Sequence, residues 1–72
     1  MDYLTHIGNL RKMDKLIRLE CTGPAKDFAE KLGISRRTVF NHIDDLKAMG
    51  AEIIYDFIKR SYCYTKPFTL KF

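Results

Sequence analysis

The stretch PAKDFAEKLGISRRTVFNHIDDLKAMG, residues 24–50, decides how this chain folds. Apolar side chains recur at helical spacing in both of its halves, at Phe28, Ala29 and Leu32 and then at Val39, Ile43 and Leu46. Between the halves, Gly33 suits the left-handed position that ends a helix. Ser35 can cap the next helix by accepting the amide hydrogen of Thr38. The stretch therefore predicts two short helices, each with one buried side, joined by a tight turn.

The crossing of these two helices is the next feature that the residues predict. Helices that cross near a right angle need a small residue at their closest approach, and Ala29 has that position. Ile34, within the turn, is expected to point into the core. This arrangement is the helix-turn-helix motif, whose second helix usually enters the major groove of DNA. We therefore expect the helix over residues 36–49 to contact DNA.

A more specific pattern runs through the motif. Residues 28–40, FAEKLGISRRTVF, are followed by Ile43, Leu46 and Gly50. This pattern closely resembles the DeoR-like winged-helix module of bacterial transcription regulators, including those that carry WYL domains, and the resemblance continues through residues 51–64 as the wing. It implies a mainly α fold with a small β-hairpin, a winged helix-turn-helix of three helices plus a two- or three-stranded wing.

The length of the chain sets its domain organisation. We assign all 72 residues to a single domain with the motif at 24–50, the wing at 51–64 and a tail at 65–72. Hydrophobic residues make up 46% and charged residues 31%, which is typical of a soluble globular domain. No apolar run approaches the roughly 20 residues of a membrane helix, and no secretory signal follows the first methionine. We expect a cytoplasmic protein that has no membrane partner and no small-molecule ligand.

A catalytic or metal site is not expected. A domain of this size buries only about 60% of the surface of its unfolded chain, which leaves little core for a catalytic cleft, and no nucleophile–base pair is visible. Cys21 and Cys63 lack further ligands at zinc-binding spacing, and His6 and His42 lie far apart in the sequence. We therefore predict no enzymatic activity, no cofactor, no metal and two reduced thiols.

We expect three polar residues of the second motif helix to have no catalytic or ligand-binding role. His42 lies between core positions, and we expect it to be partly buried and hydrogen-bonded. Asp44 and Asp45 are adjacent, so their side chains diverge by about 100° on a helix and cannot share a proton. We expect both to be solvated charges that point away from the groove.

Positive charge gathers in two segments of a chain whose net charge is +4. Every charged residue between positions 30 and 44 is basic, and so is every charged residue after position 56. A winged helix brings these two segments onto one face. Such a face is the electrostatic footprint of a surface that binds phosphates.

The predicted base contacts lie on the first two turns of the second motif helix. Arginine can bridge guanine O6 and N7, asparagine can pair with adenine N6 and N7, and an aromatic ring can pack on a thymine methyl group. These fits make Arg36, Arg37, Phe40 and Asn41 the candidates. The DeoR-like family more often shows tyrosine at position 40 and arginine at position 41, so its base preference is not carried over.

The remaining predicted contacts are to the DNA backbone. Ser35 and the start of its helix offer amide hydrogens to a phosphate, while Lys59 and Arg60 lie at the tip of the wing, near a turn expected at residues 58–61. Thr38 is expected to be packed rather than to read bases. The complete predicted set is Ser35, Arg36, Arg37, Thr38, Phe40, Asn41, Lys59 and Arg60.

The two ends of the chain go beyond the motif. We expect a first helix from Asp2 to about Glu20, with a weak point at residues 8–9 because glycine and asparagine are poor helix formers. In the wing, Ile53, Tyr55 and Phe57 alternate onto one face of a strand. The tail alternates apolar and polar residues, with Phe68, Leu70 and Phe72 as its apolar positions.

Together these features predict a small bacterial transcription regulator that binds double-stranded DNA with sequence specificity. The alternative is a winged helix that binds another protein, with Ile54, Phe57, Ile58 and Cys63 as its exposed surface, and RNA binding is a third reading. Leftover apolar surface on residues 2–9 and on the tail predicts a homodimer. The competing expectation is that the tail folds back as a third strand.

Overall fold

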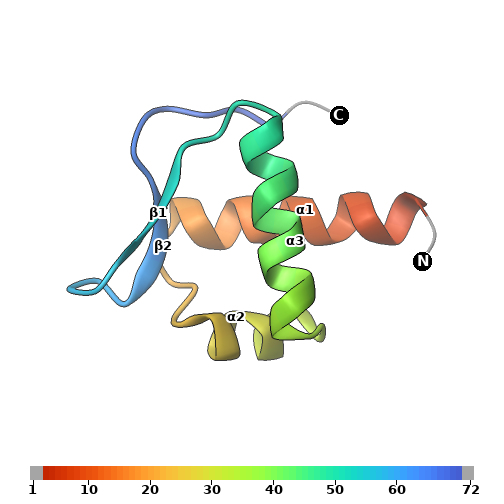
Figure 1. Ribbon diagram of the computed structural model, residues 1–72, viewed down its shortest axis with the longest axis horizontal. Coiled ribbons are helices and arrows are strands. Elements are labelled where there is room, and N and C mark those ends of the chain that lie inside the picture. The colour runs from red at the N-terminus through yellow and green to blue at the C-terminus, as the bar shows by residue number, and fades with distance from the viewer. Residues whose placement is uncertain (1–2, 71–72) are drawn as a thin grey trace.

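The computed structural model describes residues 3–70 of the chain. Three helices, α1 (Tyr3–Arg18), α2 (Ala25–Leu32) and α3 (Arg36–Ala48), are followed by the strands β1 (Ile53–Asp56) and β2 (Ser61–Tyr64). In Figure 1, α1 crosses behind α3, α2 lies at the start of α3, and the hairpin lies beside them. This confirms the predicted mainly helical winged helix, and its wing is a two-stranded antiparallel sheet.

The core lies where the three helices meet. Each helix contributes apolar side chains to this core, and the buried set is Leu10, Met13, Ile17, Phe28, Ala29, Val39, Ile43 and Leu46. Ala51 and Ile53 extend this set into the start of the hairpin. Each large apolar side chain that becomes fully buried contributes about 1.5–3 kcal/mol relative to an exposed one. The helices are therefore held mainly by this shared core.

The turn between α2 and α3 has the predicted geometry. Gly33 is left-handed, with φ at 71°, and its amide donates to the carbonyl oxygen of Glu30 at 3.2 Å. The amide of Ile34 reaches the carbonyl oxygen of Ala29 at 3.0 Å, and the Ile34 side chain packs against the core. A residue with a side chain would be strained at that φ, so glycine at position 33 sets the angle between the two helices.

The start of α3 is capped as predicted. The Ser35 hydroxyl oxygen accepts the amide hydrogen of Thr38 at 3.1 Å. The two hydroxyl groups of these residues also lie 2.8 Å apart, within hydrogen-bond distance. A cap of this kind stabilises a helix by roughly 1 kcal/mol. Helix α3 therefore begins at a defined residue, Arg36.

The turn of the hairpin departs from the prediction. The Asp56 carboxylate accepts the amide hydrogens of Ile58 at 2.9 Å and Lys59 at 3.0 Å, which ends β1 at Asp56. Phe57 consequently lies in the turn and is 83% exposed, so its placement on a strand face with Ile53 and Tyr55 was wrong. Arg60 completes the turn in the left-handed conformation, with a φ of 52°, which glycine adopts more readily than other residues.

Buried hydroxyl groups fix the hairpin to the rest of the molecule. Thr22, in the loop after α1, donates its amide hydrogen to the Ser61 hydroxyl at 3.1 Å and accepts the amide hydrogen of Tyr62 on its own hydroxyl at 2.9 Å. Thr22 and Ser61 are both fully buried. Because buried polar groups are costly to leave unpaired, this network sets where the wing lies.

Cys63 corrects the surface assigned to the protein-binding alternative. It pairs with Ile54 across the hairpin but faces the core and is only 6% exposed. Burial raises the pKa of the Cys63 thiol. The alternative therefore retains Ile54, Phe57 and Ile58, which are exposed, and loses Cys63.

The tail packs on the core of its own chain. Phe68 and Leu70 are partly buried against that core, and Arg18 donates a hydrogen bond to the carbonyl oxygen of Phe68 at 2.8 Å. The Tyr64 hydroxyl donates to Asp14 at 2.6 Å, which ties β2 to α1. Residues 65–70 form no strand, so the third strand is absent from the part of the tail that the structure describes. Phe72 lies outside the described residues.

The first helix is uninterrupted and ends slightly earlier than predicted. It runs through residues 8–9 without a break, with Asn9 and Leu10 buried, and ends at Arg18 rather than near Glu20. The proposed cap, Asp2, lies outside the described residues. No helix among residues 3–70 combines the length and the apolar character that crossing a membrane requires.

Candidate nucleic-acid interface

The outward side of α3 carries the candidate base-reading side chains. At about 100° per residue, Arg37 and Asn41 project opposite the stripe of Val39 and Leu46 that enters the core, and Phe40 lies on the flank next to them. All three are exposed, and Phe40 exposes 49% of its surface although it is aromatic. The first two turns of α3 therefore present a guanidinium group, an aromatic ring and an amide to the outside.

The arginine and asparagine side chains at the start of α3 make no hydrogen bond or ion pair within the described fold. Among residues 3–70, the side chains of Arg36, Arg37 and Asn41 have no hydrogen-bond or ion-pair partner. Thr38 differs, since it is half-buried and its hydroxyl lies at the Ser35 cap. The structure thus brings Arg37, Phe40 and Asn41 together on an open surface, leaves Arg36 exposed at the start of the helix on a different side, and leaves Thr38 in a packed position.

Asp44 shares this surface. It is exposed and lies one turn beyond Phe40 and two turns beyond Arg37 on the same side of α3. The expectation that it points away from the candidate base-reading residues does not fit this position. A carboxylate here repels phosphate but can accept a hydrogen bond from cytosine N4.

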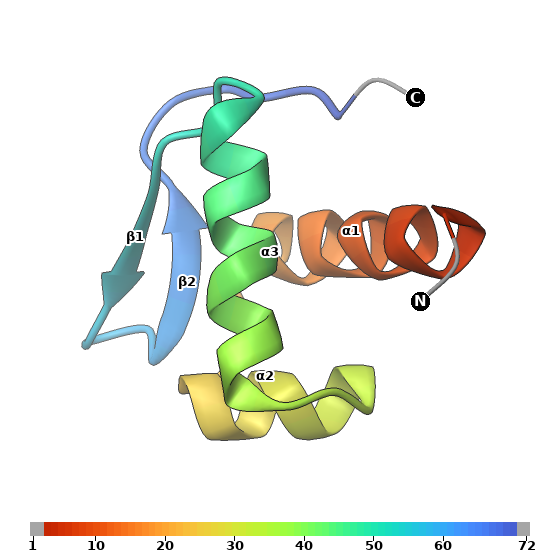
Figure 2. The same ribbon diagram turned by 45° about the vertical axis from the view of Figure 1, so that its right-hand side comes forward.

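The wing carries the second group of predicted contacts. The hairpin runs beside α3 with its turn toward the end where α3 begins, as Figure 2 shows. At that turn the Lys59 ammonium lies 2.6 Å from the Glu20 carboxylate. This hydrogen-bonded ion pair lowers the pKa of Glu20 and raises the pKa of Lys59. Arg60 has no ion pair within the described chain, so the two basic residues of the turn differ in availability.

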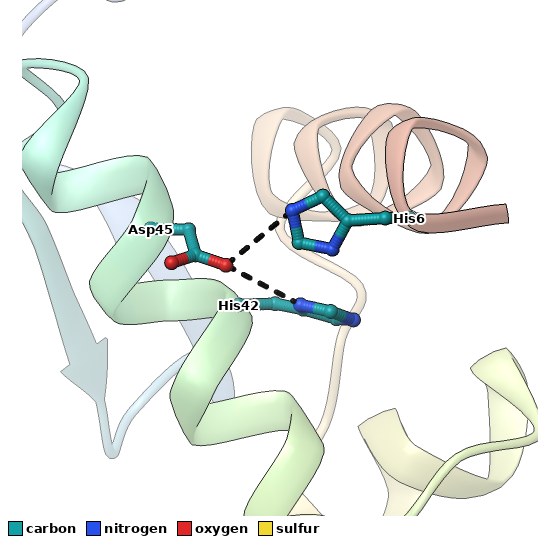
Figure 3. Close-up of side chains that lie close together, drawn as sticks. All are labelled: His6, His42 and Asp45. Carbon is teal, nitrogen blue, oxygen red and sulfur yellow. Dashed lines mark ion pairs between the residues drawn. The ribbon is translucent and has the colours of Figure 1, made fainter. Parts of the chain in front are cut away.

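A group of residues that sequence reasoning separated meets on the flank of α3. His42 and Asp45 of α3 face His6 of α1, as Figure 3 shows. The His6 ring nitrogen Nε2 lies 3.5 Å from Asp45, and the His42 ring nitrogen Nδ1 lies 3.7 Å from the same oxygen. Asp45 is therefore not an isolated solvated charge, which corrects the prediction.

His42 also departs from its expected role. It is fully buried rather than partly buried, and neither ring nitrogen has a hydrogen-bond partner within the described residues. Burial and the nearby His6 lower the pKa of His42, and Asp45 opposes that shift. The i, i+3 spacing of His42 and Asp45 is visible in the sequence, but nothing in the sequence places His6 beside them.

A comparison with known protein families fits this arrangement. The model of a family described as "HTH domain" matches residues 11–56. That span begins within α1, contains α2 and α3, and ends with β1. Comparisons with curated proteins and with solved structures give no match. The first turns of α1, the turn of the wing and β2 lie outside the matched span.

Proposed function

The chain belongs to the HTH domain family, and from this premise we propose that it binds double-stranded DNA with sequence specificity and acts as a small transcription regulator. The start of α3 enters the major groove, and the wing contacts the backbone beside it. Within the larger family we assign it to the DeoR-like winged helices of bacteria. This assignment rests on the residue pattern at 28–50, and a cytoplasmic location goes with it.

One observation carries the proposal. Arg37, Phe40 and Asn41 are exposed on one side of α3 and have no polar partner in the described part of the fold. An arginine and an asparagine on the exposed side of a helix, with no hydrogen-bond partner in the described part of the protein, are available for the edges of guanine and adenine. The capped start of α3 also leaves the amides of Arg36 and Arg37 free for a phosphate.

Selection from a random duplex library tests sequence specificity. The wild-type chain should enrich a short motif, and Arg37→Ala should lose preference at one or two positions of it. Lys12→Ala is the matched control, since it removes the same charge from the exposed surface of α1. If the wild-type chain enriched no sequence, the proposal of specific binding would be wrong.

Salt dependence tests the phosphate contacts separately. Arg36, Arg37 and Arg60 should neutralise about three phosphates, so log K should fall against log salt with a slope of about −3. A titration of a labelled duplex between low and moderate salt measures this slope. A flat dependence would contradict DNA binding of any kind.

A second candidate function, protein binding, rests on a separate observation. Ile54, Phe57 and Ile58 are exposed on the wing, and Ile58 is 95% exposed. Apolar side chains gathered in this way are typical of protein-binding surfaces. The selection experiment separates the two candidates, because a domain that binds only protein enriches no DNA sequence.

We also propose a homodimer, and this proposal now rests on the first helix and no longer on the tail. The described part of the tail packs on its own core, so the tail no longer supplies a free apolar surface. The beginning of α1 remains, with Ile7 half-buried and the helix extending beyond the rest of the fold. Two-fold symmetry would double a short binding site. Analytical ultracentrifugation of the full chain with a palindromic duplex tests it, and a single bound protomer at saturation would exclude the dimer.

A further inference from the structure

The cluster of His6, His42 and Asp45 is the most unusual polar feature of the described chain. One ligand-type atom from each residue lies within 4.8 Å of those of the other two. The two imidazole rings meet edge to face with their centres 4.9 Å apart. Figure 3 shows one carboxylate oxygen of Asp45 facing both rings. The three side chains therefore converge from two helices on one small volume.

The buried position of His42 in this cluster destabilises the folded state. The residue is 2% exposed, and both of its ring nitrogens are buried without a hydrogen bond in the described fold. An unsatisfied buried polar group loses its hydration and gains nothing in return, which is why native proteins nearly always supply a partner. The His42 Nδ1 atom faces Asp45 at 3.7 Å, which is too long for a hydrogen bond. An additional partner between these side chains would remove the cost.

We propose that His6, His42 and Asp45 bind a divalent transition metal ion, for which Zn²⁺ is the best fit. Zinc binds imidazole nitrogen at about 2.0–2.1 Å and carboxylate oxygen at about 2.0–2.2 Å, so tetrahedral ligand atoms lie about 3.3 Å apart. The separations of 3.5 and 3.7 Å from the Asp45 oxygen are close to that value. Two imidazole groups favour zinc and its neighbours over magnesium or calcium, which prefer oxygen ligands.

The site would hold the ion through three protein ligands. His42 and Asp45 share one side of α3 because they are three residues apart, and His6 comes from α1. Asp45 and His6 are both partly exposed, so a water molecule can reach the fourth position. This open position separates the site from a structural zinc site, which has four protein ligands.

The ion would link α1 directly to α3. His6 lies before the span that matches the HTH domain family, so the link uses a segment outside that span. His42 directly follows Asn41, one of the base-reading candidates. Metal binding would therefore fix α1 against the middle of α3 and stabilise the folded state.

Calorimetric titration of the full chain, without an affinity tag and freed of metal by a chelator, tests the proposal. One Zn²⁺ should bind per chain. The melting temperature should rise by roughly 10 °C or more when free zinc is a hundred times the dissociation constant. No binding, or no change in melting temperature, would overturn the site.

The location of the ion is tested with paired variants. Asp45→Asn removes a ligand, whereas Asp44→Asn makes the same charge change at the adjacent exposed position and is the control. His6→Ala and Asp45→Asn should each weaken zinc binding at least tenfold, and Asp44→Asn should leave it unchanged. Equal losses in the two aspartate variants would show a general charge effect instead. Unchanged binding in His6→Ala would place the ion elsewhere, for example on the exposed thiol of Cys21.

A measurement on the wild-type chain guards against variants that do not fold. The chain has two histidines, so nitrogen-15 spectra of its imidazole groups contain only His6 and His42. Both should shift on adding one equivalent of Zn²⁺, and a shift of neither would contradict the proposal. These experiments use no DNA, so their outcome is independent of the DNA-binding function proposed above.

Discussion

The start of α3 and the turn of the wing each carry two adjacent basic residues, yet the fold treats the two pairs differently. Arg36 and Arg37 are exposed and have no partner in the described chain. In the wing, Lys59 is held 2.6 Å from Glu20, and only Arg60 is free. The two segments carry the same formal charge, but within the described chain the start of α3 has two free cations for phosphates and the turn of the wing has one. Counting basic residues therefore overestimates what the wing contributes to binding.

The largest effect should come from displacing α3 itself. Ala29→Leu adds three heavy atoms at a buried position of α2 that packs against α3, and overpacking of this kind costs about 1–3 kcal/mol. We expect a melting temperature lower by several degrees and weaker binding to every duplex. Ala48→Leu, at an exposed position near the end of α3, is the control and should melt like the wild-type chain. Equal melting of both variants would mean that the helices do not meet at Ala29.

The next effect separates the two basic pairs by specificity. Arg37→Ala, and likewise Asn41→Ala, should cost about 1–3 kcal/mol on the preferred duplex and much less on an unrelated one. Arg60→Ala should weaken both duplexes by a similar factor. Binding titrations on the two duplexes measure the difference. A change of sequence preference in Arg60→Ala would contradict the division between base-reading helix and backbone-binding wing.

A smaller effect distinguishes the two basic residues of the wing. Arg60→Ala should reduce the slope of log K against log salt by about one unit, as expected for one lost phosphate contact. Lys59→Ala should change the slope less, because its ammonium group already neutralises Glu20. Glu20→Gln is the complementary test and should tighten binding by freeing Lys59. If Lys59→Ala had the larger effect, the ion pair would not hold in the DNA-bound state.

The smallest effect is the pH dependence of this ion pair. Because Lys59 lowers the pKa of Glu20 in the folded state, the pair stabilises the fold at neutral pH. That stability is fully present above the unfolded-state pKa of Glu20, about 4.3, and is lost as the pH falls through the lower folded-state value. Stability curves of the wild-type chain and Glu20→Gln should therefore converge in acid. A difference that persists at pH 2 would have another cause.

The α2–α3 motif could be predicted from the residues because its determinants are local. Gly33 ends one helix, Ser35 caps the next, and the stripe of Val39, Ile43 and Leu46 marks the buried side. Each of these depends on neighbours within a few positions, where helical geometry fixes the distances. Once the buried stripe of α3 is known, the remaining side of the helix is the exposed one. The sequence is therefore enough to predict that Arg37 and Asn41 are exposed.

The hairpin was predictable only in outline. The alternation of Ile53 and Tyr55 marks a strand, but the end of that strand is set by the hydrogen bonds of Asp56 to the next two amides. Whether Cys63 faced the core could not be decided, because both faces of a short hairpin carry apolar side chains. The contact of Thr22 with Ser61 across 39 positions settles that orientation.

What the sequence determined by itself is therefore the helix-turn-helix motif and the exposed side of its second helix, since these rest on contacts within a few residues. The tertiary structure alone decided which charges remain free and which side chains meet. Glu20 reaches Lys59 across 39 positions, and His6 reaches His42 and Asp45 only because α1 packs across α3. Such pairings depend on how whole elements pack, and side-chain periodicity along one helix carries no information about the residue that a distant helix brings to it.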